Sequence, residues 1–126
     1  MSEEADPLRV VDREPFAYVT TVGRRSGRPH RIEIWFARGG RTLYLLSGGG
    51  DRADWVANLR ATPRVRVEVG PVDTEATARV VTDDDERAQA RRLVFDKYQR
   101  QYAGDLTRWR ERSLPVAIDL PEEAAS

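Results

Sequence analysis

The sequence predicts a mainly β, α+β domain in which a six-stranded antiparallel barrel carries two to three helices on its outside. Three observations support this class. Several short segments alternate apolar and polar residues, most connections between them are of hairpin length, and the expected order is β-β-β-α-β-β-α-β. That order differs from the regular strand–helix alternation of a parallel doubly wound sheet, and it suits an antiparallel barrel.

The first half of the chain is expected to supply three strands and a short helix. Residues 16–22 are rich in aromatic and β-branched side chains, and residues 31–36 alternate with a period of two. Gly39 and Gly40 then turn the chain into residues 42–46, which predicts a hairpin between the last two segments. A helix is expected after Asp51, which would cap it, and it must end before Pro63.

The second half is expected to add a hairpin, a long helix and a last strand. Residues 64–69 and 76–80 alternate, and Gly70-Pro71 lies between them. Asp83 with Glu86 three residues later predicts the start of a helix. Its apolar stripe recurs every four residues (Ala90, Val94, Tyr98, Tyr102). A helical turn is expected around 106–112, and a strand over 114–120.

The length of 126 residues favours one domain. We expect a polar lead-in over residues 1–13, a single barrel domain over 14–121, and a tail over 122–126. The chain begins with an acidic stretch that lacks the apolar run of a signal peptide, and no segment is apolar enough to span a membrane. These features predict a cytoplasmic protein without an integral membrane segment.

The composition excludes several kinds of chemistry. With no cysteine, the chain has neither disulfides nor thiol catalysis, and a single histidine argues against a metal site and a Ser-His-Asp triad. Lysine and arginine together number 21, as do aspartate and glutamate, so the net charge of zero gives no attraction to nucleic acid. The charges are unevenly placed, because six arginines lie between residues 24 and 41 and six acids between residues 73 and 86.

The segment Gly23-Arg24-Arg25-Ser26-Gly27 is the first candidate anion site. Glycines allow the backbone to approach a ligand closely, arginine offers a planar set of donors, and serine adds a hydroxyl. An ordinary hairpin turn with exposed arginines explains the same pattern. The segment is not a Walker loop, because it lacks the Gly-Lys-Ser/Thr ending and the following helix.

The segment Ser47-Gly48-Gly49-Gly50-Asp51 is the second candidate. It precedes an expected helix, and helix N-termini present free backbone N–H groups to anions. A flexible connection between a strand and a helix is the simpler reading. Three consecutive glycines are entropically costly, however, which favours a close approach of the backbone to a ligand.

Together these two motifs and residues 55–65 (WVANLRATPRV) resemble the nitroreductase-type deazaflavin-dependent oxidoreductases of actinobacteria, most clearly over residues 16–82. The resemblance implies a split β-barrel like that of the flavin-binding pyridoxamine-phosphate oxidases. It also implies binding of coenzyme F-420, a deazaflavin with a phosphodiester and a polyglutamate tail. The reduced cofactor would transfer a hydride to a small electron-poor substrate such as a quinone or a nitro compound.

The resemblance also assigns roles to individual residues. Cofactor binding would fall to the two motifs and to the helix after them (Arg24, Arg25, Ser26, Gly27, Ser47, Gly48, Gly49, Trp55, Asn58). Within this set, Arg24, Arg25 and Ser26 would hold the phosphate and the tail. Tyr98 and Tyr102 would face the substrate. The substrate would take its proton from solvent, from Ser47 or from one of the two tyrosines. Ser47, Tyr98 and Tyr102 are therefore the candidate catalytic residues.

One position departs from the family pattern. Many members carry lysine after the serine of the second motif, and this chain has Gly48. Other hypotheses therefore remain open: the same barrel with FMN, or a non-redox carrier of a fatty acid or similar anionic lipid. A nucleic-acid-binding barrel is disfavoured by the zero net charge. The sequence is compatible with a monomer or a homodimer.

Overall fold

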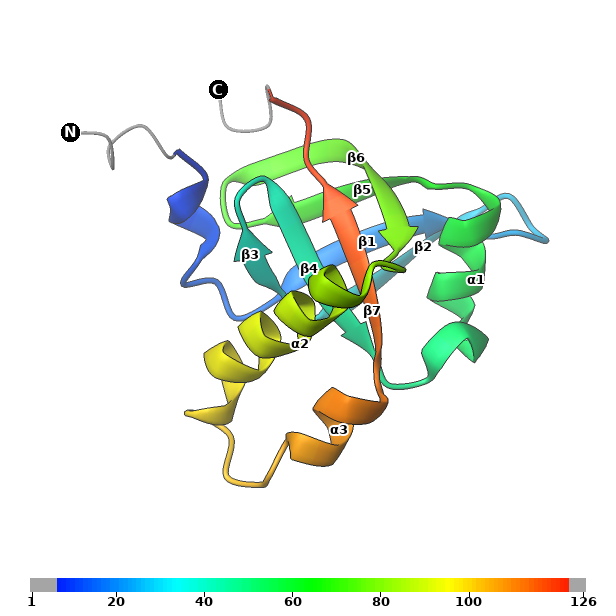
Figure 1. Ribbon diagram of the computed structural model, residues 1–126. Coiled ribbons are helices and arrows are strands. Elements are labelled where there is room, and N and C mark those ends of the chain that lie inside the picture. The colour runs from blue at the N-terminus through cyan, green and yellow to red at the C-terminus, as the bar shows by residue number, and fades with distance from the viewer. Residues whose placement is uncertain (1–6, 123–126) are drawn as a thin grey trace.

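The computed structural model describes residues 7–122, in which one sheet and its helices form a half-barrel (Figure 1). The sheet has seven antiparallel strands in the order β2-β1-β5-β6-β7-β4-β3. The strands are β1 (Ala17–Val22), β2 (Pro29–Ile34), β3 (Ala37–Gly39), β4 (Thr42–Ser47), β5 (Arg64–Val69), β6 (Val72–Val80) and β7 (Leu114–Asp119). The helices are α1 (Asp54–Ala61), α2 (Asp84–Gln99) and α3 (Thr107–Arg112), with 3-10 turns η2 (Pro7–Val11) and η3 (Gly50–Arg52).

The predicted antiparallel class is confirmed, but the number of strands and one hairpin are wrong. The expected strand 31–36 was to pair with 42–46; instead β2 pairs with β1, and the short β3 pairs with β4 across the Gly40 turn. β2 ends at Ile34, and the backbone N–H of the buried Phe36 donates to the Tyr98 hydroxyl at 3.1 Å instead of to a neighbouring strand. Over residues 35–36 the chain passes from one end of the sheet order to the other.

Two hydrophobic clusters hold the fold together. The larger one fills the inside of the half-barrel, where Val19, Val67 and Ile118 are fully buried and α1 adds Val56 and Leu59. The smaller one lies between α2 and strands β3, β4 and β7, and Tyr44, Val94 and Ala117 belong to it. Burial of these apolar side chains is the main stabilising contribution, at roughly 1.5–3 kcal/mol for each large one.

The segment expected as a polar lead-in contributes to the core. Its 3-10 turn η2 buries Leu8 and Val11 in the larger cluster, with 1% and 0% of their surfaces exposed. Residues 1–6 and 123–126, the remaining parts of the expected lead-in and tail, lie outside the described residues. Within residues 7–122, no helix is both long and apolar enough to cross a membrane.

The helix starts show which capping predictions hold. The side chain of Asp83 accepts a hydrogen bond from the backbone N–H of Glu86 at 2.9 Å, as the sequence predicts for α2. Asp51 does not cap α1, because residues 50–52 form η3 and the N-cap position of α1 is Ala53. Tyr102 does not extend the buried stripe of α2, because the helix ends at Gln99 and Tyr102 is 49% exposed.

Candidate functional site

Asn58 fastens the turn between β1 and β2 to helix α1. Its side-chain oxygen accepts hydrogen bonds from Arg24 twice, from the backbone N–H at 3.1 Å and from Nη1 at 2.9 Å. Its side-chain nitrogen donates to the hydroxyl of Thr21 at 3.2 Å. Asn58 is 4% exposed and Thr21 is fully buried, so these bonds are shielded from water and fix the turn in place.

The guanidinium of Arg24 already has hydrogen-bond partners on α1. Besides Asn58, it meets the carboxylate of Asp54 at 3.3 Å and the carbonyl of the same residue at 3.5 Å. Both partners lie on α1, so Arg24 joins the turn to the start of the helix. The structure therefore gives Arg24 a positioning role, and phosphate binding by its side chain stays a prediction.

The turn brings its backbone and side chains close together. The N–H of Gly27 donates to the carbonyl of Gly23 at 2.8 Å, and Gly27 has a φ of 72°, which favours glycine. A Cβ at Gly23 would lie 2.6 Å from both Nε2 of His30 and Oγ of Ser26. A side chain at position 23 would therefore displace the ends of these two exposed polar side chains from the turn.

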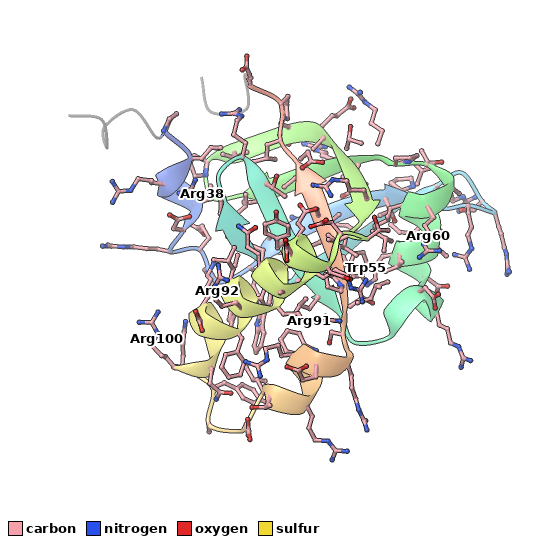
Figure 2. The ribbon with its side chains drawn as sticks, viewed as in Figure 1. Arg38, Trp55, Arg60, Arg91, Arg92 and Arg100 are labelled. Carbon is pink, nitrogen blue, oxygen red and sulfur yellow. The ribbon has the colours of Figure 1, made fainter. Side chains whose placement is uncertain are left out.

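A pocket of about 530 Å³ lies between this turn, β2 and α1. Residues predicted to bind the cofactor line it, namely Arg24, Arg25, Ser26, Trp55 and Asn58; five further residues complete the lining, namely Gly23, His30, Arg31, Ile32 and Asp54. Trp55 also packs against the larger hydrophobic cluster, and Figure 2 shows it between α1 and the strands. Ionic groups in the lining are mainly positive, with three arginines and a single carboxylate.

Arg25 is the lining cation without an internal partner. Arg24 is bound to α1, and Arg31 pairs with Glu68 at 3.1 Å while its guanidinium lies 4.0 Å from the Tyr18 ring centre. Arg25 makes neither an ion pair nor a hydrogen bond within residues 7–122. A guanidinium left free beside a glycine-framed turn can bind a phosphate or a carboxylate in a bidentate manner.

The second motif does not line this pocket. The hydroxyl of Ser47 is buried and donates to the carbonyl of Gly50 at 2.9 Å, which closes the loop that leads into η3. Gly48 and Gly49 are exposed. A Cβ at Gly48 would lie 3.4 Å from Nε1 of Trp109, so this loop faces α3. The second motif therefore lies outside the pocket beside the first, and its contact with the same cofactor stays a prediction.

The two candidate tyrosines lie around Trp35. The ring of Tyr98 stacks on Trp35 with centroids 4.3 Å apart, and the ring of Tyr102 meets it edge-on at 5.8 Å. Both tyrosines line a small pocket of about 140 Å³. The Tyr98 hydroxyl donates to the carbonyl of Pro15 at 2.8 Å, and burial raises the pKa of Tyr98 to about 12. The hydroxyl of Tyr102 has no hydrogen-bond partner within the described chain.

Sequence reasoning missed several residues of the pocket beside the β1–β2 turn. The pocket is also lined by His30, Arg31 and Ile32, because β2 folds back antiparallel onto β1 directly after the turn. Two strand-like segments joined by a short glycine-containing turn are the sequence signal for this pairing. Asp54 lines the pocket and bonds to Arg24, 30 positions away, and Thr21 supports the site through its bond to Asn58, 37 positions away. No local pattern reveals such contacts. Among residues 7–122, no group of three or more histidine or acidic side chains could hold a metal ion.

Comparisons with known proteins fit this architecture. Residues 3–121 match the family described as F420H(2)-dependent quinone reductase. An F420H(2)-dependent quinone reductase of Mycobacterium tuberculosis is 29% identical over 114 residues, which cover 87% of this chain and 76% of that protein.

Solved structures share the fold. An F420-H2 dependent reductase, FDR-A, superposes with a TM-score of 0.65 at 24% identity, over 83% of this chain and 93% of that one. An FAD-binding protein of Mesorhizobium loti superposes with a TM-score of 0.65 at 18% identity, over 94% of this chain and 89% of that one. Since the family match spans nearly the whole chain, this protein belongs to the F420H(2)-dependent quinone reductase family of oxidoreductases.

Proposed function

We propose that this protein binds reduced coenzyme F-420 and uses it to reduce a quinone or a similar electron-poor compound, such as a nitro compound. The observation that carries the proposal is the free guanidinium of Arg25 in the pocket between the β1–β2 turn and α1. The family match and the M. tuberculosis relative supply the cofactor and the reaction class.

The residues of the pocket suit the anionic portion of this cofactor. A phosphodiester and a chain of glutamates require cations and donors on a rigid frame, and the bonds between Arg24 and Asn58 provide that frame. Arg25 and Ser26 lie on the turn that this frame holds, and Trp55 offers an aromatic surface at the edge of the same pocket. Ser47, Gly48 and Gly49 would contact another part of the cofactor along the η3 loop.

The bound cofactor supplies the hydride, so the protein's task is to bind, to orient and to manage a proton. Two of the candidate proton donors already donate their hydroxyl protons to backbone carbonyls, Ser47 to that of Gly50 and Tyr98 to that of Pro15. The hydroxyl of Tyr102 is half-exposed and has no partner within residues 7–122. We therefore propose that Tyr102 or solvent protonates the reduced substrate.

A fluorescence titration with oxidised coenzyme F-420 tests the binding site. We expect micromolar or tighter binding, with the affinity reduced about ten- to a hundredfold in Arg25→Ala, since one charge-assisted contact contributes about 1.5–3 kcal/mol. Arg60→Ala, which removes an exposed arginine from α1 outside the pocket lining, should leave affinity unchanged. Equal affinities for all three proteins would exclude Arg25 as a cofactor ligand.

FMN is the second candidate cofactor, since a phosphate site does not identify the ring and one similar structure is named as FAD-binding. The same titration with FMN distinguishes the two. Tighter binding of FMN would overturn the deazaflavin assignment. If neither cofactor binds, the remaining hypothesis is a non-redox carrier of a fatty acid or a similar anionic lipid.

The assembly state and the location complete the proposal. A similar structure, 17% identical with a TM-score of 0.68, is described as a domain-swapped dimer. For this chain a monomer or a homodimer, and a cytoplasmic location, stay predictions. Light scattering on the purified protein with and without coenzyme F-420 would decide the assembly state.

A further inference from the structure

A larger cavity, of about 640 Å³, lies away from the proposed cofactor pocket. It is bounded by residues 12–15, by β3 and by the second half of α2. Figure 1 shows these segments at the left of the molecule, whereas α1 and the β1–β2 turn lie at its right. No residue lines both cavities, so a ligand of the larger one would not compete with the cofactor for contacts.

Lys97 lines this cavity and is the only lysine in a chain that has 20 arginines. Its Nζ donates to the carbonyl of Glu14 at 2.9 Å and lies 3.6 Å from the ring centre of Phe36. No carboxylate within residues 7–122 forms an ion pair with it. Burial lowers the pKa of Lys97 to about 8, so a substantial fraction of the amine is neutral near physiological pH.

The charged groups around Lys97 leave unpaired cations at the cavity. Its lining contains the cations Arg13, Arg38, Lys97 and Arg100 and the acids Asp12, Glu14 and Asp96. Arg38 and Asp12 pair at 2.7 and 2.9 Å, and the Glu14 carboxylate packs against Gly70. Within the described chain Arg13 and Arg100 pair with no carboxylate, although Nε of Arg100 donates to the backbone carbonyl of Asp96 at 3.3 Å. The carboxylates of Glu14 and Asp96 have no ion-pair partner there either, so the three unpaired cations of the lining outnumber its unpaired acids by one. Figure 2 shows Arg38 and Arg100 on this side of the molecule.

We propose that Lys97 is a covalent modification site, at which the cavity binds a small acyl phosphate and the lysine accepts its acyl group. The lone pair of Nζ attacks the carbonyl carbon and forms a C–N bond. The bond between that carbon and the phosphate oxygen breaks, inorganic phosphate leaves with the electron pair, and the nitrogen releases a proton to solvent. The product is an uncharged amide, and no further reactant is required.

The neighbouring arginines explain why the donor is anionic. A guanidinium binds phosphate oxygens and stabilises the charge that develops on a leaving phosphate. Arg13 and Arg100 line the same cavity as the amine, so a donor held there by its phosphate would lie in the cavity that Lys97 also lines. An uncharged acyl donor would not be bound by these arginines, so its rate of reaction with Lys97 should not depend on them. Such a donor therefore serves as a control.

The test is acylation of the purified protein by acetyl phosphate at pH 7.5, followed by peptide mass spectrometry. Because the chain has one lysine, side-chain amide formation reports on Lys97 alone. We expect acetylation at least about tenfold faster than that of a lysine in an unstructured peptide, as the lowered pKa predicts. The double variant Arg13→Gln/Arg100→Gln should lose most of this advantage, whereas Arg60→Gln should keep it.

Two further measurements complete the design. With p-nitrophenyl acetate, an uncharged donor, wild type and the double variant should react at equal rates, which shows that the amine is intact. Millimolar inorganic phosphate should slow the reaction with acetyl phosphate only. A rate within twofold of the peptide lysine would overturn the proposal, and so would equal rates with acetyl phosphate in wild type and the double variant. The assay contains no coenzyme F-420, so its outcome is independent of the proposed reductase function.

Discussion

The side-chain oxygen of Asn58 lies 3.1 Å from the backbone nitrogen and 2.9 Å from Nη1 of Arg24, across 34 residues of sequence. This relationship makes the proposed cofactor site a joint product of the first hairpin and the first helix. A turn rich in glycine and arginine would otherwise have many conformations to lose on binding an anion. Here the helix fixes the turn before any ligand arrives.

Asn58→Ala should therefore weaken both folding and cofactor binding. The change leaves the Arg24 N–H and the Thr21 hydroxyl without their partner, at a cost of about 1–3 kcal/mol in the free energy of unfolding. Urea unfolding measures that loss, and titration with coenzyme F-420 measures the affinity. Asn58→Asp keeps an acceptor for Arg24 and should lose less of both. An alanine variant with unchanged affinity would contradict the idea that this contact organises the site.

Tyr98→Phe separates a structural role from a catalytic one. The hydroxyl of Tyr98 accepts from the backbone N–H of Phe36 and donates to the carbonyl of Pro15, and both contacts lie 62 or more residues away in sequence. Their loss should lower the free energy of unfolding by about 1–3 kcal/mol. Tyr102→Phe should leave stability unchanged and lower kcat if Tyr102 supplies the proton. A loss of kcat in a fully stable Tyr98→Phe would instead assign the proton to Tyr98.

The same hydroxyl shows why part of the fold could not be predicted. Ile32, Ile34 and Phe36 alternate without interruption, so the sequence favours one strand through residue 36 and a hairpin at Gly39 and Gly40. The strand ends at Ile34, and the backbone N–H of Phe36 bonds to a side chain on α2, a contact 62 residues away that no local pattern reveals. Interactions within a few residues, such as Asp83 with Glu86, were predicted correctly because they depend on local sequence alone.

In the candidate site, too, features that depend on local sequence could be predicted, and features that depend on distant contacts could not. Local pattern and the family resemblance identified the glycine-framed turn with Arg24, Arg25 and Ser26 as a candidate site, and these three residues line the pocket; their role as cofactor ligands stays a prediction. The bonds that tie Arg24 to α1 could not be predicted, because its partners Asp54 and Asn58 lie 30 and 34 residues further along the chain. Nor could local pattern show that Ser47, Gly48 and Gly49 lie outside the pocket that the first turn lines.

Glu86 should make stability depend on pH in the acid range. Its carboxylate binds Arg79 at 2.8 Å and accepts from the Tyr44 hydroxyl at 2.7 Å, and the bond to Arg79 is the main reason that its pKa falls from 4.5 to about 2. A pKa lowered by folding stabilises the protein above the unfolded value, so this contribution is present above pH 4.5 and is lost as the pH falls toward 2.

Urea unfolding of wild type and Glu86→Gln between pH 2 and 7 measures this effect. The difference at neutral pH should be about 1 kcal/mol, because the Arg79 side chain is 41% exposed and the pair is partly screened. The two curves should converge toward pH 2. Asp85→Asn, on the exposed side of α2, is the control and should follow wild type more closely. Parallel curves for wild type and Glu86→Gln would show that the ion pair does not set the pH dependence.

Gly48 tests whether the η3 loop touches the cofactor's anionic groups. Gly48 lacks a positive φ, and a Cβ there would lie in ordinary contact with Nε1 of Trp109 at 3.4 Å, so a side chain fits without backbone strain. Gly48→Lys would place a cation where many members of the resembled family carry one. If a phosphate or glutamate lies there, the affinity for coenzyme F-420 should rise about three- to tenfold, which corresponds to roughly 0.6–1.4 kcal/mol.

Gly48→Ala supplies the matched control, because it adds the Cβ without the charge and should leave the affinity near that of wild type. The gain in Gly48→Lys should also shrink as salt is raised from 50 to 500 mM, since screening weakens an exposed ionic contact. Equal affinities for the lysine and alanine variants at low salt would place the anionic part of the cofactor elsewhere. The pocket beside Arg25 would then bind it alone, and Ser47 through Gly49 would serve only to lead the chain from β4 into α1.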